Sequence, residues 1–383
     1  MSSGFDVCIR GDGMVGRSLA LLLARQRLRV GLVGSAVKPN DVRAYSLNSA
    51  SRQMLEDLRC WPDAQHATPV RQMRVWGDDA GFVRFDATED GQADALSWIV
   101  DVPVLEQRLA DAVSFTPEIT RLDAPAPAAL TVICEGRHSA TREALGVRFD
   151  TLPYHQQAVA ARLRASQPHR GQALQWFHHG PNGLEILALL PLGGDEGDTL
   201  ALVWSLPPER AQAVLALDTQ AFAHAVHDAS HGHLGELTCV SERAVCPLQL
   251  ARATEWCGHM ADGSAWVLAG DAAHAIHPLA GLGLNLGLAD AAELAQALSN
   301  RQGADYWRGV GDRALLRRYE RARKAGMLPT WLACDGLQRL FAHPDTRVQA
   351  LRNWGMRGFN QLPALKRWTM QQAMQPSTSS STS

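Results

Sequence analysis

The N-terminal 34 residues combine a glycine pattern with two apolar strands, and this combination restricts the fold more than any other feature of the sequence. Residues 5–10 alternate as in a short strand, residues 15–26 carry apolar side chains at helical spacing, and residues 29–33 form a second apolar strand. The motif G-x-G-x-x-G, made by Gly11, Gly13 and Gly16, separates the first strand from the helix. This order predicts a βαβ unit and therefore a parallel sheet.

The glycine turn is of the kind that binds the pyrophosphate of a dinucleotide. Glycines permit the tight turn, the close approach of the pyrophosphate and the close packing of the helix on the strand. The N-terminus of the helix offers free N–H groups and the positive end of the helix dipole to the phosphates. A tight turn without a ligand is the alternative interpretation.

Two residues in this unit depart from the usual dinucleotide-binding pattern. Gly34 follows the second strand, where an acidic residue is expected to bind the adenosine ribose. Asp12 places a negative charge inside the phosphate turn, where it would repel the ligand unless it points away or Arg10 compensates.

The composition is that of a globular protein and argues against several classes of function. There are 37 Lys and Arg residues against 39 Asp and Glu, so no basic excess points to nucleic-acid binding. No apolar run approaches the roughly 18 residues of a membrane span, and the N-terminus leaves no room for a signal peptide. The seven cysteines are scattered, as is typical of reduced thiols in a cytosolic protein. We therefore expect a cytoplasmic location.

A second glycine-rich region lies far downstream. Residues 264–269 form a buried-strand pattern, and the sequence GDAAHAIHPLAGLGLNLG follows from Gly270, with a loop expected at 276–287 and a helix at 288–298. Asp271 could accept hydrogen bonds from a chain of hydroxyls, and the glycines would let the backbone approach a flat ring. The dipole of the helix would stabilise the negative charge of a reduced flavin. A glycine-rich connection without a ligand is the alternative.

The remaining sequence supplies a third turn and an antiparallel sheet. The turn Cys134-Glu135-Gly136-Arg137-His138-Ser139 follows an expected strand at 129–133, with Arg142 three residues further on. Strand-like runs at 73–85, 157–163, 184–192 and 199–206 lie between turn signals and predict an antiparallel sheet. Residues 304–375 are helical in composition, and the tail 376–383 is of low complexity.

Together, the three turns resemble those of the FAD-dependent aromatic hydroxylases, and in particular the ubiquinone-biosynthesis hydroxylases of the UbiH/UbiF type. The supporting stretches include GDGMVGRSLALLLA, the downstream GDAAH motif with its glycine loop, and RRYERAR. The resemblance implies an α/β fold with a Rossmann-like FAD-binding parallel sheet, a second, largely antiparallel substrate sheet and C-terminal helices. It assigns residues 1–70, 100–150 and 255–303 to the FAD-binding domain, 71–99 and 151–254 to the substrate-binding domain, 304–375 to C-terminal helices and 376–383 to a disordered tail.

The resemblance also implies roles for individual residues. Gly11, Gly13 and Gly16 would hold the FAD pyrophosphate, Arg43 would contact the phosphate–ribityl region, and Asp271 would bind the ribityl hydroxyls. Gly136 would lie near the flavin and nicotinamide sites. The residues expected to border the isoalloxazine ring are Pro278, Gly281, Gly283, Leu284 and Asn285. Tyr154 and His274 are the candidates for a general base, and His274 is also interpreted as a structural residue of its motif.

Four departures from the family pattern predict weaker flavin binding. Gly34 replaces the ribose-binding acid, and Glu135 replaces the Asp of an Asp-Gly turn. Leu282 replaces a Gln of the glycine loop, and Val102 stands where a polar flavin contact is common. The connection between residues 111 and 130 also looks short for the usual strands.

The implied activity is the NAD(P)H-dependent hydroxylation of an aromatic ring. NAD(P)H would reduce FAD, O2 would form a flavin hydroperoxide, and the substrate would be a polyprenylated phenol of ubiquinone biosynthesis. Association with a ubiquinone-biosynthesis protein complex and peripheral contact with the inner membrane are further expectations. The alternatives are a hydroxylase of a soluble aromatic compound and a non-catalytic paralogue that serves as an assembly subunit.

A group of histidines invites a different hypothesis, a metal site, which we do not favour. His224 and His227 are separated by one helical turn, His231 and His233 flank Gly232, and Asp228 is expected to point in another direction. A solvated helix end is the preferred interpretation, and no metal is expected.

Overall fold

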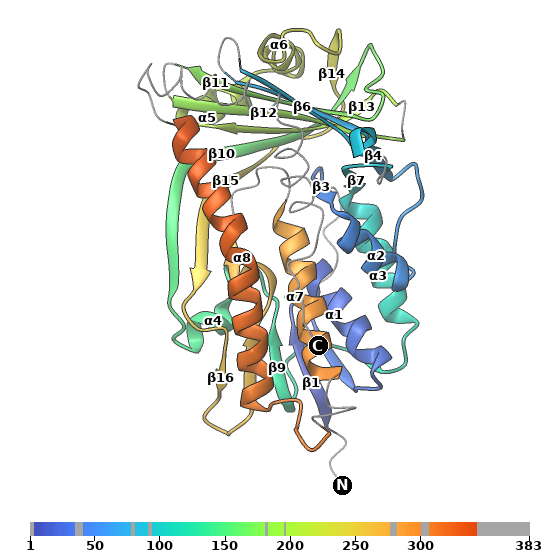
Figure 1. The fold of residues 1–383 in the computed structure, drawn as a ribbon, viewed down its shortest axis with the longest axis vertical. Helices are drawn as coiled ribbons and strands as arrows, with labels where there is room; N and C mark the ends of the chain where they lie inside the picture. The colour runs from blue at the N-terminus through green and yellow to red at the C-terminus, as the bar shows by residue number, and fades with distance from the viewer. Residues whose placement is uncertain are drawn as a thin grey trace.

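The computed structural model describes residues 4–34, 41–77, 81–90, 94–180, 183–194, 197–275, 282–299 and 306–342. The described strands form a six-stranded, a nine-stranded and a three-stranded sheet. Figure 1 shows the nine-stranded sheet across one end of the molecule, with the six-stranded sheet and its helices below it.

The six-stranded sheet contains the N-terminal βαβ unit. Its order is β16-β17-β9-β1-β2-β8, and every pair is parallel except β16–β17. The strands are β1 (Phe5–Arg10), β2 (Val30–Val33), β8 (Ile119–Leu122), β9 (Ala128–Ile133), β16 (Cys257–His259) and β17 (Ala265–Leu268). Most inner-strand residues are buried, as their continuous apolar runs require in a parallel sheet covered on its faces.

Helices from distant parts of the chain pack around this sheet. Helix α1 (Met14–Arg25) contacts α3 (Val102–Ser114) and α7 (Leu282–Ser299), and α7 also contacts the long helix α8 (Arg313–Ala342). Two shorter helices, α2 (Ser49–Asp57) and α4 (Ala140–Ala144), begin at the side-chain caps Asn48 and Ser139.

The nine-stranded sheet has the order β18-β15-β10-β13-β12-β11-β5-β6, with β14 paired to β10. All its pairs are antiparallel except β5–β11. The strands are β5 (Gln72–Trp76), β6 (Phe82–Asp86), β10 (Phe149–Ala165), β11 (Gln172–Gly180), β12 (Gly183–Leu192), β13 (Thr199–Leu206), β14 (Leu237–Cys239), β15 (Ala244–Ala253) and β18 (His274–Ala275).

The two faces of this sheet have different neighbours. The outer face packs in one apolar cluster with α5 (Pro208–Ala216) and α6 (Thr219–Ala229), and Val159, Ala161 and Leu163 of β10 belong to that cluster. The opposite face points toward the parallel sheet (Figure 1). The small sheet β3-β7-β4, made by Ala44–Leu47, Ser97–Asp101 and Ala67–Val70, lies between them and packs against Ala173 and Ala201.

The expected fold class is confirmed, with local corrections. The run at 73–85 is two strands, β5 and β6, rather than one. The residues after Leu282 are helical rather than part of a loop, and the connection that looked short holds both the end of α3 and strand β8. The domain boundaries stay a prediction, and the expectations for residues 343–383 lie outside the described residues.

Candidate cofactor site

Three turns that are far apart in the sequence meet at one edge of the parallel sheet. Strands β9, β1 and β17 are parallel neighbours through β9, so their carboxyl ends lie at the same edge. The segments that follow them are the glycine turn at Gly11, the turn at Cys134 and the turn at Gly270. Ligands of open α/β sheets bind at this edge.

The first turn is packed so closely that two of its positions accept only glycine. A Cβ atom at Gly11 would lie 2.4 Å from the carbonyl oxygen of Cys134, and one at Gly16 would lie 1.9 Å from the carbonyl oxygen of Gly11. Gly11 also has a φ of 108°, which favours glycine. Gly13 is the N-cap of α1, and a Cβ there would meet no atom within 4 Å. The space beside Gly13 is therefore open at the N-terminus of a helix.

Direct contacts join the other two turns to the first. A Cβ atom at Gly287 of α7 would lie 2.6 Å from Cγ2 of Val15 and 3.4 Å from Cα of Gly270. The buried Arg142 guanidinium donates to the carbonyl oxygen of Ala272 at 3.1 Å and to that of Arg137 at 2.8 Å. The three turns therefore meet in the fold.

Asp271 and Arg43 lie within electrostatic range of each other. Solvent reaches the Asp271 carboxylate, and no described residue donates a hydrogen bond to it. Desolvation by the surrounding protein raises the pKa of Asp271, an effect that nearby positive groups, including Arg137 and Arg43, oppose. Arg43 donates to Asp41 at 2.9 Å and to the hydroxyl of Tyr45 at 3.1 Å. Arg43 is therefore already paired with an acid, and its contact with flavin stays a prediction.

The residues predicted to border the flavin ring have different environments. Gly283 lies at the start of α7, and a Cβ there would meet no atom within 4 Å. Leu284 is buried in the core, and Leu282 is the first residue of α7. Pro278 and Gly281 lie outside the described residues.

The side chain of Asn285 has a structural role. It accepts hydrogen bonds from the backbone N–H of Asn48 at 2.9 Å and from the hydroxyl of Ser51 at 2.8 Å, and it donates to the carbonyl oxygen of Ser46 at 2.7 Å. These bonds fasten the start of α7 to the start of α2. The contact of Asn285 with the flavin ring stays a prediction.

Three of the departures from the family pattern have structural explanations. Glu135 accepts from the hydroxyls of Ser139 at 2.7 Å and Thr141 at 2.6 Å and pairs with Arg10 at 3.0 Å. It also accepts from the backbone N–H of Thr141 at 3.1 Å, so it assists the N-cap Ser139 at the start of α4. Burial raises the pKa of Glu135, but these hydrogen bonds outweigh it and hold the pKa below its usual value. Val102 is buried in the core. Beside Gly34 lies the side chain of Asp12, which also pairs with Arg17 at 3.2 Å.

The two candidate bases are both buried, and neither has the exposure expected of a group that receives a substrate proton. His274 is 2% exposed, stacks on Trp256, and its Nε2 lies 2.6 Å from Asp290. Tyr154 is 9% exposed and packs with Ala158, Leu248 and Leu250 beside a bulge in β10. The structural interpretation of His274 is the one that this geometry supports.

Asp290 is a structural residue that the sequence reasoning missed. It accepts from the backbone N–H of Gly270 at 2.8 Å, from His274, and from Nε of Arg323 at 2.6 Å. Burial raises the pKa of Asp290, but the interactions of the carboxylate with His274 and Arg323 outweigh this effect and lower the pKa. An acidic residue within the apolar helical pattern LGLADAAEL was the signal that could have revealed it.

The histidine group needs one correction. Asp228 does not point away, because it lies one helical turn after His224: its Oδ2 is 3.5 Å from Nε2 of His224, and its Oδ1 is 3.4 Å from Nδ1 of His227. The ligand atoms of these three residues lie within 4.8 Å of one another, and His224 and Asp228 are exposed. Exposed groups of this kind are common without a bound ion. A solvated helix end therefore remains our interpretation of this histidine group.

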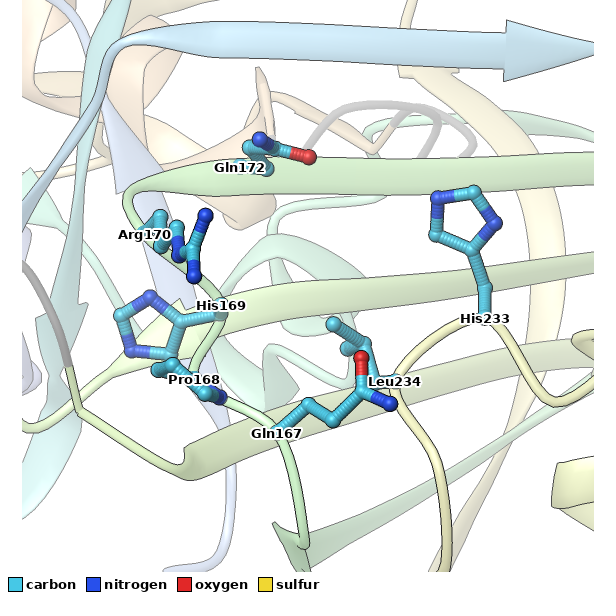
Figure 2. A pocket seen from close by; sticks show the side chains of 7 residues that line it. All are labelled: Gln167, Pro168, His169, Arg170, Gln172, His233 and Leu234. Atoms are coloured by element: carbon cyan, nitrogen blue, oxygen red, sulfur yellow. The ribbon is translucent and has the colours of Figure 1, made fainter.

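A cavity of about 280 Å³ lies in the nine-stranded-sheet region, between the turn at residues 167–172 and His233–Leu234 after α6 (Figure 2). Figure 2 shows Arg170, Gln172 and His233 around it. Its described lining includes none of the predicted cofactor residues. The cavity is therefore distinct from the edge where the glycine turns meet.

Comparisons with known proteins agree with this geometry. Residues 115–327 match the family described as FAD binding domain. The chain is 29% identical to "Ubiquinone hydroxylase UbiL" of Rhodospirillum rubrum, covering 96% of this chain and 89% of the relative. It is 26% identical to the "3-demethoxyubiquinol 3-hydroxylase" of Escherichia coli, covering 96% and 98%.

A solved structure supports the fold. The p-nitrophenol 4-monooxygenase PnpA from Pseudomonas putida DLL-E4 matches with a TM-score of 0.73 and 18% identity, covering 98% of this chain and 99% of that one. The resemblance expected from the sequence is confirmed. Because the FAD binding domain spans more than half of the chain, the chain belongs to this family of FAD-binding monooxygenases.

Proposed function

We propose that this chain hydroxylates the aromatic ring of a polyprenylated phenol in ubiquinone biosynthesis, with FAD as cofactor and NAD(P)H and O2 as co-substrates. The observation that carries the proposal is the meeting of the glycine turns at Gly11, Cys134 and Gly270 at the carboxyl edge of the parallel sheet. The named hydroxylases among its relatives support the pathway and the ring chemistry.

The residues at this edge suit the parts of FAD. The open space beside Gly13 and the free N–H groups at the start of α1 fit a pyrophosphate. Asp271, to which no described residue donates, would accept hydrogen bonds from the ribityl hydroxyls. The open position at Gly283 would let a flat ring approach the start of α7. When bound, FAD supplies the electron transfer and the oxygen chemistry.

The face of the nine-stranded sheet that points toward the parallel sheet suits an apolar substrate. Ala160, Val203 and Ala188 are cross-strand neighbours on β10, β13 and β12, and all are half-buried. Their side chains alternate with those that pack against α5 and α6. We assign the aromatic substrate to this apolar face, where packed side chains would also keep water from the reacting atoms.

A polyprenylated substrate lies in a membrane, so the enzyme must meet it there. None of the described helices has the length and apolarity needed to cross a bilayer. We therefore propose peripheral association with the inner membrane, directly or through a complex of biosynthetic proteins, with the catalytic domains in the cytoplasm. Co-sedimentation of the purified chain with phospholipid vesicles that carry a prenylated phenol tests direct association.

The activity is tested with FAD-loaded protein, NADH or NADPH, and two kinds of phenol. The proposal predicts that a prenylated phenol accelerates NAD(P)H oxidation and gains one oxygen atom, measured by mass spectrometry. Hydroxylation of only the soluble phenol would favour the alternative substrate class. Loaded protein that oxidises no NAD(P)H with either phenol would favour the non-catalytic assembly subunit.

A further inference from the structure

The side chain of Asp12 lies where a side chain at position 34 would begin. A Cβ atom built on Gly34 would be 2.0 Å from Cγ and 2.2 Å from Oδ1 of Asp12. Real Cβ atoms do not approach other atoms so closely, so no larger residue fits at position 34 while Asp12 adopts this conformation. The glycine at position 34 and the acid at position 12 are therefore sterically linked.

Arg17 fixes the orientation of this carboxylate. Its Nη2 lies 3.2 Å from Oδ2 of Asp12, and its Nη1 donates to the carbonyl oxygen of Glu106 at 3.0 Å. The Arg17 side chain is 3% exposed and that of Asp12 is 20% exposed. Among the described residues, Arg17 alone donates to Asp12, so Oδ1 keeps its capacity to accept hydrogen bonds from a ligand.

The location of Oδ1 suggests the group that it accepts from. In dinucleotide-binding βαβ units, the residue after the second strand is the acid that hydrogen-bonds the ribose hydroxyl of the adenosine. Here that position is Gly34, directly after β2, and the carboxylate above it comes from the glycine turn instead.

We propose that Asp12 binds the adenosine ribose of the dinucleotide, in place of an acid at the end of β2. The ion pair with Arg17 offsets the charge of Asp12 and so limits its repulsion of the neighbouring pyrophosphate. This inference rests on the proposed FAD site. The proposal explains together why an acid stands at position 12 and a glycine at position 34. These two departures from the usual dinucleotide-binding pattern are then no longer reasons to expect weak flavin binding.

The test uses the full chain freed of flavin, with ADP and 2′-deoxy-ADP as competitors of FAD. The wild type is expected to bind ADP about tenfold more tightly than 2′-deoxy-ADP, since a hydrogen bond to a charged group contributes roughly 1.5 kcal/mol. In the Asp12→Asn variant, the ratio of the affinity for ADP to the affinity for 2′-deoxy-ADP should fall toward one. Asp6→Asn, at the opposite end of β1 and paired with Arg29, is the matched control that should keep the preference.

Two outcomes would overturn the inference: a wild type without preference for the 2′-hydroxyl, or an Asp12→Asn variant that retains it. If the carboxylate only repels phosphate, Asp12→Asn should bind both nucleotides more tightly in an unchanged ratio. The double variant Asp12→Ser, Gly34→Glu is expected to regain the preference, whereas a double variant that binds ADP without it counts against the proposal. A wild type that does not bind FAD at all would contradict the proposed function instead.

Discussion

Around the glycine turns, individual arginines are paired with carboxylates. Arg10 pairs with Glu135 at 3.0 Å, Arg17 with Asp12 at 3.2 Å, and Arg43 with Asp41. These side chains therefore bring little net positive charge to the site. For the proposed site, the attraction for a pyrophosphate is therefore expected to come mainly from the N–H groups at the start of α1.

Asp271, which we propose to bind the ribityl hydroxyls, should lower the stability of the flavin-free protein. Its raised pKa means that the folded chain binds this proton more tightly than the unfolded chain does. The ionised Asp271 carboxylate therefore destabilises the folded state. This destabilisation is absent at pH values below the pKa of Asp271 in the unfolded chain and is complete above its pKa in the folded chain. Asp271→Asn should therefore raise the melting temperature of the flavin-free protein at pH 7 and reduce its affinity for FAD.

Thermal unfolding and FAD titration of the same samples test this prediction. The stabilising effect of Asp271→Asn should disappear at a pH below about 3, where the aspartate is protonated in both states. Asp262→Asn is a suitable control, because hydrogen bonds from Ser264 lower the pKa of Asp262, so its replacement should not raise stability. A lower melting temperature for Asp271→Asn than for the wild type at pH 7 would show that the charged carboxylate does not destabilise the flavin-free fold.

Among the elements, α7 shows where sequence reasoning succeeded and where it failed. Alternating and continuous apolar runs predicted β1, β12, β13 and β17, because these patterns reflect local burial. The sequence predicts a loop where α7 begins, because Gly283 and Gly287 weaken a helical pattern. The bonds from Asn285 to α2 are tertiary and leave no local signal. The same holds for the steric link between Asp12 and Gly34.

The two glycines of α7 give a matched pair of variants. Gly287→Ala would place a methyl group 2.6 Å from Val15, so it should separate α7 from α1 and lower stability. Gly283→Ala meets open space within a helix, so it should leave stability unchanged or raise it by about 0.5–1 kcal/mol. If Gly283 borders the flavin ring, Gly283→Ala should still weaken FAD binding. Equal stability of the two variants would show that α7 and α1 are not in close contact at Gly287 and Val15.

The buried Asp290 joins α7, α8 and the turn at Gly270. Asp290→Ala would leave His274 and Arg323 buried without their carboxylate, so it should destabilise the fold by about 3–5 kcal/mol in chemical denaturation. The control is Glu118→Ala, whose partner Arg27 is 86% exposed, with an expected loss of at most about 1 kcal/mol. Similar losses for both variants would argue against a stabilising role for the Asp290 network.

On the scale of the whole molecule, the nine-stranded sheet is tied to the rest of the chain by an ion pair. Arg162 of β10 pairs with Asp101, which precedes α3, and the two side chains are 23% and 15% exposed. The neighbouring pair Arg164–Asp198 joins residues of the same sheet region and is much more exposed, at 64% and 52%. The partly buried pair should therefore contribute more to stability.

A pair of double-mutant cycles measures this difference. The cycle of Arg162→Gln and Asp101→Asn should give a coupling energy of about 1 kcal/mol or more, because the pair is only partly screened by solvent. The cycle of Arg164→Gln and Asp198→Asn should give less than about 0.5 kcal/mol. Additive effects on stability in the first cycle would show that the Arg162–Asp101 pair does not hold the nine-stranded sheet to the three-stranded sheet.

In the proposed site, the turns at Gly11, Cys134 and Gly270 hold one FAD molecule between them. Titration of the flavin-free chain with FAD, followed by quenching of flavin fluorescence, tests it most directly. We expect saturable binding of one FAD per chain, weakened by Gly283→Ala at one end of the site and by Asp12→Asn at the other. Absence of saturable binding by a folded chain, or binding that both substitutions leave unchanged, would contradict it.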